Sequence, residues 1–350
     1  MPELTINQDT QSDHCQKALS SQFMQMLTGY WVSQSIMTVV KLNIADELKE
    51  QPQDIHMLSK SVGAHQDSLY RLMRMLSSIG IFKESESQVF GLTPLAELLC
   101  SDSPNSMKPM VMMLSGENYT AWEHLYEGVK SGESPFEKVF GMEIFQYFNT
   151  HPNAQQVFNN AMATLIRSDS TAIINAYNYD QHQTLVDVGG GNGMLLTTLL
   201  SHYPSLSGVL FDLPSVINGV TEKLRAEFED RCHTVSGDFF ESVPAGGDCY
   251  VLSRVIRGFD DERALKILNN IYKVMPVQGK LLLMEFILEL GDDPSTATTK
   301  LMDINMMVFA PGGRDRTEEE HQTLLQKAGF ELIKVISTEN DICILEAIKK

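Results

Sequence analysis

Apolar residues recur every three or four positions through the first part of the chain, a spacing typical of amphipathic helices. Between Gln16 and Glu50 this spacing predicts helices whose apolar face carries Leu19, Phe23, Met26, Leu27, Tyr30, Ile36, Val39, Val40, Ile44 and Leu48. From Asp54 to Leu99 the pattern predicts two short helices separated near Gly63, and then a small β-hairpin formed by residues 81–83 and 89–92. Two helices followed by a hairpin form a winged-helix shape.

Short apolar runs alternate with helical stretches in the second half of the chain. The runs predict seven strands: Leu185–Val188, Gly208–Asp212, His233–Ser236, Cys249–Ser253, Lys280–Phe286, Glu331–Ser337 and Ile342–Ile348. Helices are expected between the first five of them, at Met194–His202, Pro214–Phe228 and Glu262–Met275. Such alternation implies an α/β fold with a mostly parallel sheet covered on both faces. Because only residues 338–341 separate the last two strands, these should form an antiparallel hairpin.

The composition is that of a globular protein of two domains, with 350 residues, 43% hydrophobic and 21% charged. No apolar run approaches the roughly 20 residues that cross a bilayer, and the polar N-terminus does not resemble a secretory signal, so no membrane partner is expected. The five cysteines form no metal-binding spacing and predict no metal site. They are expected to be reduced thiols of a cytoplasmic protein.

The net charge of −18 disfavours a nucleic-acid partner, because a polyanion needs a segregated basic patch to bind phosphates. The winged-helix pattern invites a DNA-binding interpretation, but residues 54–99 contain four basic and five acidic side chains. A scaffold and dimerisation role is therefore preferred for this part of the chain, and a small molecule is the expected partner.

A glycine-rich segment joins the first predicted strand of the second half to its helix, with the sequence Leu185-Val-Asp-Val-Gly-Gly-Gly-Asn-Gly193. Glycines let the backbone approach a ligand closely, and the following helix presents free N–H groups. A dinucleotide fingerprint would place its third glycine at position 194, where this chain has Met194. The acid Asp187, two residues before the first glycine, suits the ammonium group of S-adenosylmethionine (SAM) better than a pyrophosphate.

Two further acids stand at the ends of the next two predicted strands. Asp212 could bind both ribose hydroxyls of SAM, with Leu213 against the adenine, and Asp238 with Phe239 could bind the adenine amino group and ring. Each acid alone is more often a capping or turn residue. Three acids at successive strand ends, at the edge where such sheets bind ligands, favour a SAM site.

These motifs resemble the small-molecule O-methyltransferases of the caffeate, hydroxyindole and polyketide-tailoring type. The resemblance spans nearly the whole chain and rests on Leu185–Gly193, Phe211–Pro214, Gly237–Phe239, Leu252–Val255, Asp260–Glu262, Asp303–Met306 and Gly312–Thr317. It implies a winged-helix-like dimerisation domain over residues 1–110 that forms a homodimer. A helical connector lining the acceptor pocket (111–175) and a seven-stranded Rossmann-like SAM-methyltransferase domain (176–350) would follow.

The resemblance also implies which residues form the site. Those expected to contact SAM are Asp187, Gly189, Gly191, Asp212, Leu213, Asp238, Phe239, Ser253 and Arg254. Those expected to line the acceptor pocket are Trp122, Phe145, Phe158, Met162, Met302 and Met306.

The chain departs from this family where the chemistry is expected. The family has a histidine after the fourth strand that removes the acceptor's proton, whereas this chain has Arg257. An arginine stays cationic and cannot act as a general base. Glu285 and Asp315 stand where the family has flanking acids, and could either pair with Arg257 or take part in catalysis. His124 is a further titratable candidate in the acceptor-facing segment, although a lone histidine is more often structural.

Three functions remain open. The first is methyl transfer, at oxygen, to an aromatic or polyketide-like secondary metabolite. An already acidic acceptor would be steadied by Arg257, or His124 or Glu285 would act as the base. The second is chemistry without methyl transfer, such as hydroxylation, decarboxylation, dehydration or pericyclic reactions, in which the sulfonium charge acts with Arg257 and His124. The third is a non-enzymatic SAM-binding scaffold.

Overall fold

The computed structural model describes residues 8–350, with side chains from Gln16 onward except Lys223 and Glu229. It divides into two compact units, Met1–Ser115 and Gly116–Lys350. The predicted connector over residues 111–175 therefore begins in the first unit and continues in the second. Its role at an acceptor pocket stays a prediction.

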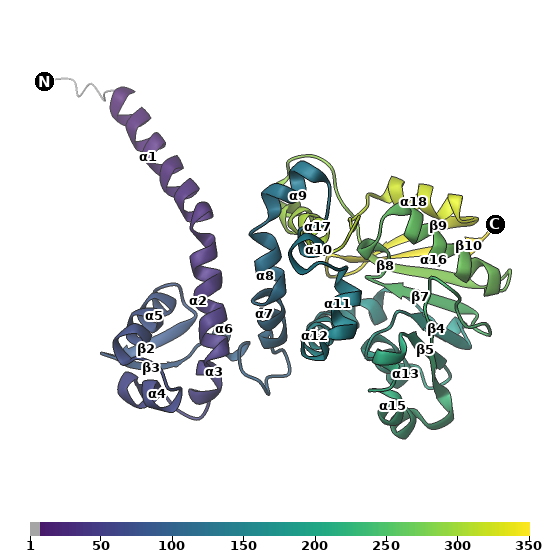
Figure 1. The fold of residues 1–350 in the computed structure, drawn as a ribbon, viewed down its shortest axis with the longest axis horizontal. Helices are drawn as coiled ribbons and strands as arrows, with labels where there is room; N and C mark the ends of the chain where they lie inside the picture. The colour runs from purple at the N-terminus through teal and green to yellow at the C-terminus, as the bar shows by residue number, and fades with distance from the viewer. Residues whose placement is uncertain (1–7) are drawn as a thin grey trace, which may run out of the picture. The chain divides into compact units, whose positions relative to one another are not determined.

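The first unit is mostly helical with a small sheet (Figure 1). Its elements are α1 (Gln8–Leu27), α2 (Gly29–Lys41), α3 (Ile44–Glu47), β1 (Gln53–Asp54), α4 (Ile55–Ser61), α5 (Gln66–Ser78), β2 (Phe82–Glu86), β3 (Val89–Leu92), α6 (Pro94–Glu97) and α7 (Lys108–Leu114). The Asp54 side chain caps α4 by accepting from the N–H groups of His56 and Met57. Strands β2 and β3 pair antiparallel, so the predicted helix–helix–hairpin pattern is confirmed.

The second unit contains a seven-stranded sheet in the order β6-β5-β4-β7-β8-β10-β9. Its strands are β4 (Thr184–Val188), β5 (Ser207–Asp212), β6 (Cys232–Ser236), β7 (Cys249–Ser253), β8 (Lys280–Phe286), β9 (Phe330–Ser337) and β10 (Ile342–Lys349). The first five are parallel, while β10 pairs antiparallel with both β8 and β9. All seven predicted strands and the terminal hairpin are confirmed.

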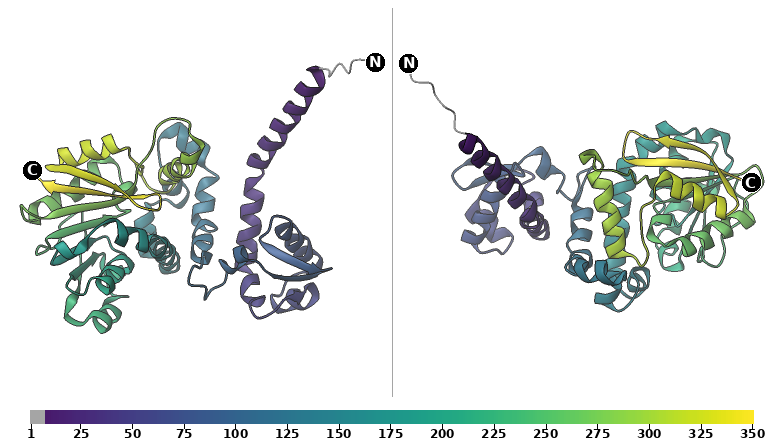
Figure 2. Two further views of the ribbon diagram at one scale, coloured as in Figure 1. Left: turned by 180° about the vertical axis from the view of Figure 1, so that it is seen from behind. Right: turned by 90° about the horizontal axis from the view of Figure 1, so that it is seen from above.

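Helices of the second unit cover both faces of this sheet (Figure 2). The helices of this unit, on the sheet or beside it, are α8 (Glu117–Trp122), α9 (Leu125–Ser131), α10 (Pro135–Phe140), α11 (Ile144–Thr150), α12 (Pro152–Ala176), α13 (Met194–His202), α14 (Pro214–Ile217), α15 (Thr221–Phe228), α16 (Asp261–Val274), α17 (Ala297–Phe309) and α18 (Glu318–Lys327), with short 3-10 turns at η1 (Tyr179–Gln181), η2 (Glu229–Arg231), η3 (Ile256–Gly258) and η4 (Pro294–Thr296). One buried cluster joins the sheet to α12, α13 and α15, and a second joins it to α16 and α18.

The prediction of one continuous helix at Pro214–Phe228 is wrong. Residues 214–228 form two helices, α14 and α15, separated at Asn218–Val220. Asn218 and Gly219 both have low helix propensity, whereas the apolar periodicity by itself gives no sign of this break. None of the described helices is long and apolar enough to span a membrane. Among the described cysteines, Cys100, Cys232, Cys249 and Cys343 are free thiols, while Cys15 lies outside the described side chains.

Candidate functional site

The glycine-rich loop lies between β4 and α13, at the carboxyl edge of the parallel strands. Gly189, Gly191 and Gly193 have φ values of 72°, 60° and 76°, a left-handed conformation that glycine adopts at little cost. At Gly190 an added Cβ would lie 2.5 Å from both Asp187 Oδ2 and Leu210 Cδ1. The loop therefore needs glycine at 190 for space and at its neighbours for backbone conformation.

Asp212 holds this loop from the end of β5. Its Oδ2 accepts the N–H of Gly191 at 2.7 Å, and its Oδ1 accepts the N–H of Leu213 at 2.7 Å. Burial raises the pKa of Asp212, while these two N–H groups act in the opposite direction. Each carboxylate oxygen can accept a second hydrogen bond, so the predicted ribose contact is compatible with this geometry.

Asp187 lies beneath the same loop and is only 1% exposed. Neither of its carboxylate oxygens has a hydrogen-bond partner among the described residues. Burial and the nearby Asp212 together raise the pKa of Asp187 to about 7. The carboxylate has no open face here for a ligand's ammonium group, so its direct contact with SAM stays a prediction.

The segment after β6 brings Asp238 and Phe239 to the loop. Asp238 Oδ1 accepts the N–H of Phe240 at 2.7 Å, which fixes the turn. The carbonyl of Phe239 accepts from Asn270 of α16 at 2.9 Å. A Cβ at Gly189 would lie 3.4 Å from the Phe239 ring, so these two predicted cofactor residues are neighbours.

Arg257 occupies the short turn η3 after β7 and is only 6% exposed. Its Nη2 donates to Asp315 Oδ2 at 2.6 Å, and its guanidinium lies 4.7 Å from the centre of the Phe286 ring. Glu285 is also buried, and its Oε1 accepts the N–H of Ile256 at 3.0 Å. The structure thus brings together three of the four predicted catalytic residues.

The two acids beside Arg257 have raised pKa values. Burial raises the pKa of Glu285 to about 7, with the Arg257 charge lowering it and Asp315 raising it further. Burial likewise raises the pKa of Asp315 to about 6, against the lowering effect of Arg257. Among the described atoms, Arg257 Nε, Glu285 Oε2 and Asp315 Oδ1 are buried without a hydrogen-bond partner. The cluster therefore keeps unused donors and acceptors.

Arg254 and Ser253, both predicted to contact SAM, lie at the end of β7. Arg254 has a φ of 56° and forms an ion pair with Asp169 of α12, so its guanidinium is already engaged by the protein. Its Nε and Nη1 and the Ser253 hydroxyl are buried without a partner among the described residues. Their cofactor role stays a prediction.

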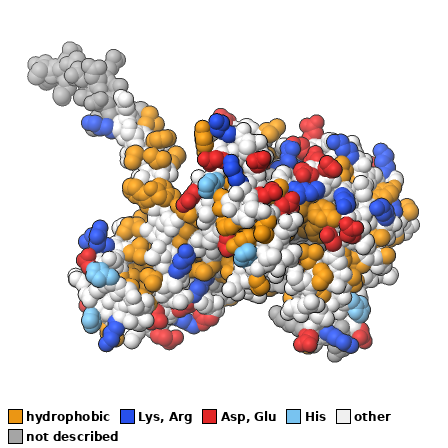
Figure 3. All heavy atoms as spheres, in the orientation of Figure 1, with side chains coloured by type: hydrophobic (Ala, Val, Ile, Leu, Met, Phe, Trp, Pro, Cys, Tyr) orange, Lys and Arg blue, Asp and Glu red, His pale blue; other side chains and the backbone are white. Residues whose placement is uncertain are grey.

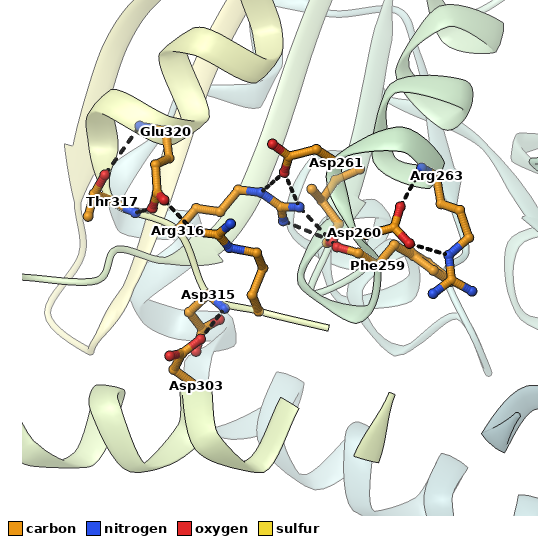
Figure 4. A network of polar contacts seen from close by, with 11 residues as sticks. Phe259, Asp260, Asp261, Arg263, Asp303, Asp315, Arg316, Thr317 and Glu320 are labelled. Carbon is orange, nitrogen blue, oxygen red and sulfur yellow. Dashed lines mark hydrogen bonds and ion pairs between the residues drawn. The ribbon is translucent and has the colours of Figure 1, made fainter. Parts of the chain in front are cut away.

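Arg316 was missed by the sequence analysis, although it lies within the family-like segment Gly312–Thr317. Its side chain is fully buried, and Figure 4 shows it pointing toward Asp261 and Phe259. It donates to Asp261 Oδ1 at 2.8 Å and to the carbonyls of Phe259 and Ile256 at 2.9 and 3.2 Å. The N–H of Arg314 also donates to the carbonyl of Arg257 at 2.8 Å. Arg316 thus fixes the turn that carries Arg257.

The predicted acceptor-lining residues are partly brought together. Trp122 Nε1 donates to Asn305 Oδ1 of α17 at 2.9 Å. The Phe145 ring lies 6.4 Å from Phe158 and 6.0 Å from Phe259, which in turn lies 5.8 Å from Phe239. An aromatic series therefore connects the predicted acceptor and cofactor segments. Met302, the neighbour of Asn305 on α17, and Met162 and Met306 are all half-buried.

His124 is the predicted catalytic residue that the structure does not bring to the cluster. Its side chain is 44% exposed at the start of α9, with Nδ1 3.9 Å from Glu127 Oε2. Among the described residues no contact joins it to Arg257. A catalytic role for His124 therefore lacks support from this geometry.

Comparisons with known proteins agree with this architecture. Residues 122–331 match the O-methyltransferase domain and residues 24–102 the O-methyltransferase dimerisation domain. The chain is 42% identical over 330 residues to the phenazine O-methyltransferase PhzM of Lysobacter antibioticus, covering 94% of this chain and 96% of that protein. The crystal structure of LaPhzM superposes with a TM-score of 0.91 at 41% identity, covering 95% and 99% of the two chains. The O-methyltransferase NcsB1 from neocarzinostatin biosynthesis, solved with SAM and 2-hydroxy-5-methyl naphthoic acid, gives a TM-score of 0.79 at 27% identity, with 91% and 96% covered.

Proposed function

The chain belongs to the O-methyltransferase family and is a SAM-dependent methyltransferase, and on that premise we propose that it methylates an acidic oxygen of an aromatic secondary metabolite without a histidine base. The observation that carries this proposal is the ion pair between Arg257 and Asp315, at the position where the family resemblance places the base. The guanidinium has no lone pair to take a proton. It is a hydrogen-bond donor suited to an anion.

The glycine loop fits the cofactor. Gly190 can carry no side chain, and Asp187 beneath it is a buried carboxyl group to which no described residue donates, which suits a cationic ligand above the loop. SAM, when bound, would supply the electrophilic methyl group. The chain's own part is to place the acceptor oxygen in line with that methyl group and to exclude water.

Arg257 would hold the negative charge of the acceptor. An oxygen that arrives as an oxyanion needs no base, so orientation and charge stabilisation are what remain for the protein to provide. The unpartnered Nε of Arg257 leaves a donor that is not used by Asp315. Glu285 is an unsuitable base in this arrangement, because its Oε1 accepts from Ile256 and the residue is closed to solvent.

An aromatic acceptor is favoured by the lining and by the relatives. Trp122, Phe145 and Phe158 present aromatic rings on the predicted acceptor side. PhzM is called a phenazine O-methyltransferase, and NcsB1 was solved with 2-hydroxy-5-methyl naphthoic acid, and both of these compounds are aromatic. We therefore propose a hydroxylated polycyclic aromatic acceptor.

A pair of acceptors that differ in hydroxyl acidity tests this function. Without a base, the pH dependence of kcat/KM should follow the pKa of each acceptor's hydroxyl, so the more acidic compound should reach its plateau at lower pH. S-adenosylhomocysteine should form in step with the methylated product. In the variant Arg257→His, the new histidine beside Asp315 should act as a base and extend methylation to the less acidic compound. Identical pH profiles for both acceptors, or product without consumption of SAM, would contradict the proposal.

The alternative of SAM-dependent chemistry without methyl transfer needs His124 beside Arg257. The exposed position of His124, with Glu127 as its neighbour, gives that pair no structural support. This alternative would be supported if turnover required SAM, stopped when S-adenosylhomocysteine replaced SAM, and consumed no SAM.

We also propose that a second copy of the chain covers the apolar face of α1 and α2. Leu19, Phe23, Met26 and Trp31 are more than half exposed there, and Figure 3 shows apolar side chains gathered along α1. The matching dimerisation domain supports a homodimer as the occupant. Phe23→Asp should convert the dimer to monomer in light scattering, whereas Lys60→Asp on α4 should not.

A further inference from the structure

Asp187 stands apart from the other buried carboxylates of the second unit. Asp212 accepts two backbone N–H groups and Asp315 accepts from Arg257, so each has a donor that compensates for burial. No described residue donates to either oxygen of Asp187, which is buried close to Leu210 and the backbone of Gly190. A carboxylate in such surroundings is strongly disfavoured in its charged form.

The groups that face Asp187 add no positive charge. Asp212 on β5 is acidic, and the Cys232 thiol on β6 has its own pKa raised by burial and then by Asp187. On β7 the paired residue is Val251, and α13 contributes leucines to the adjacent core. No cation among the described residues contacts Asp187. At a given pH, only a positive charge from outside the protein can therefore shift Asp187 further toward its ionised form.

We propose that, near and below neutral pH, Asp187 is largely protonated in the ligand-free enzyme and releases its proton when positively charged SAM binds over the glycine loop. This rests on the proposed assignment of that loop as the cofactor site. On binding, the carboxylic acid becomes a carboxylate beneath the loop, attracted to the cation above it without direct contact, and the proton passes to solvent. When the methyl group leaves, the sulfonium becomes an uncharged thioether, and Asp187 takes a proton back from solvent.

The consequence is a preference for substrate over product that depends on pH. At neutral pH, SAM carries one more positive charge than S-adenosylhomocysteine, so it gains more from an ionised Asp187. By linkage, a ligand that favours the ionised form binds more tightly as pH rises through the ligand-free pKa, which is about 7. The preference for SAM should therefore grow between pH 6 and pH 8, and it would favour release of the spent cofactor.

Isothermal titration calorimetry in buffers of different ionisation enthalpy tests this without measuring turnover. At pH 6, SAM should release about 0.9 proton per site and at pH 8 about 0.1, from the ligand-free pKa of about 7. S-adenosylhomocysteine should release less than half as much at pH 6. The affinity for SAM should rise roughly five- to tenfold from pH 6 to pH 8.

Asp187→Asn provides the test at the residue itself, because the amide keeps the shape of the neutral acid. The variant should bind SAM without proton release and with an affinity that no longer changes with pH. Binding of S-adenosylhomocysteine by the same variant shows that it is folded. The exposed Asp292→Asn is the matched control and should retain the wild-type proton release.

The outcomes separate this inference from the proposed function. SAM binding without proton release, or equal release for both ligands, would overturn the inference and leave methyl transfer untouched. Proton release that persists in Asp187→Asn would overturn it as well. Absence of any SAM binding would instead refute the cofactor assignment on which both proposals depend.

Discussion

Replacing Glu285 by glutamine should make the protein more stable at pH 8, although it removes a charged residue from the centre of the second unit. Glu285 is 1% exposed, and among the described residues its Oε1 accepts the N–H of Ile256 while its Oε2 has no partner. Glutamine keeps an oxygen for that N–H and is neutral at every pH. The variant therefore resembles the protonated wild type.

The magnitude follows from the pKa of Glu285, which burial raises from 4.5 to about 7. A raised pKa means that the folded state keeps its proton where the unfolded state has lost it, so stability is fully present below pH 4.5 and falls as pH rises to about 7. Each pH unit in this window corresponds to about 1.4 kcal/mol, so the total is about 3 kcal/mol. Glu285→Gln should avoid that loss.

Urea unfolding from pH 4.5 to pH 8 measures the effect. The two tryptophans are Trp31 and Trp122, so a Trp31→Phe background makes Trp122 fluorescence a reporter of the second unit. Wild type and Glu285→Gln should unfold at similar urea concentrations near pH 4.5 and diverge by about 3 kcal/mol at pH 8. The exposed Glu289→Gln is the control and should follow wild type throughout.

Parallel curves for wild type and Glu285→Gln across this range would refute the reasoning, because they would show that Glu285 is ionised in both states. The methylation rate of the same variant tests whether Glu285 is a general base. A general base typically increases the rate of the reaction by roughly 10²- to 10⁴-fold. A loss of that size in a variant of unchanged or greater stability would identify Glu285 as the missing base and remove the argument for an acceptor that ionises by itself.

Three further predictions concern the loop, the turn and a buried histidine. Gly190→Ala should weaken SAM binding in calorimetry by more than tenfold, because its Cβ would overlap Asp187 and Leu210, whereas Gly29→Ala, with open space around it, should have no effect. Arg316→Met should destabilise the second unit by at least about 2 kcal/mol in urea and reduce kcat, because Asp261 and two carbonyls lose their donor; wild-type stability would contradict this. Burial lowers the pKa of His321 from 6.5 to about 4, so the unfolded state takes a proton first, and stability should fall by about 3 kcal/mol between pH 6.5 and pH 4. His321→Leu should remove that part of the pH dependence of the urea midpoint.

The sheet could be predicted from the sequence because its signal is local. Seven apolar runs of strand length, each bounded by loops or helices, needed no tertiary information, and the four-residue gap before Ile342 was enough to predict the antiparallel hairpin. The loop after β4 was likewise predictable, since three of its glycines have φ values that other residues rarely adopt. The break of the predicted helix at Asn218–Val220 was missed because apolar periodicity continues on either side of it.

The site was predictable only where its residues lie at strand ends. Asp187 and Asp212 lie at the carboxyl ends of β4 and β5, and Asp238 lies just after β6, so the topology brings them to one edge of the sheet. The buried role of Arg316 could not be predicted, because it depends on a loop after α17 meeting the turn after β7. The exposure of His124 is equally a property of packing, and its place near predicted acceptor residues in the sequence gave no information on it.

The exchange of histidine for arginine at position 257 changes what the surrounding acids do. With a histidine, a neighbouring carboxylate would orient the ring and stabilise its protonated form as it takes a proton. With Arg257, the same carboxylate of Asp315 receives a fixed donor at 2.6 Å, and no proton needs to move within the pair. Arg316 donates to the backbone carbonyls of Ile256 and Phe259, so the turn has an anchor that does not involve the side chain at 257. The turn is therefore suited to position a base but holds an arginine, and this is why the acceptor proposed above is one acidic enough to lose its proton without a base.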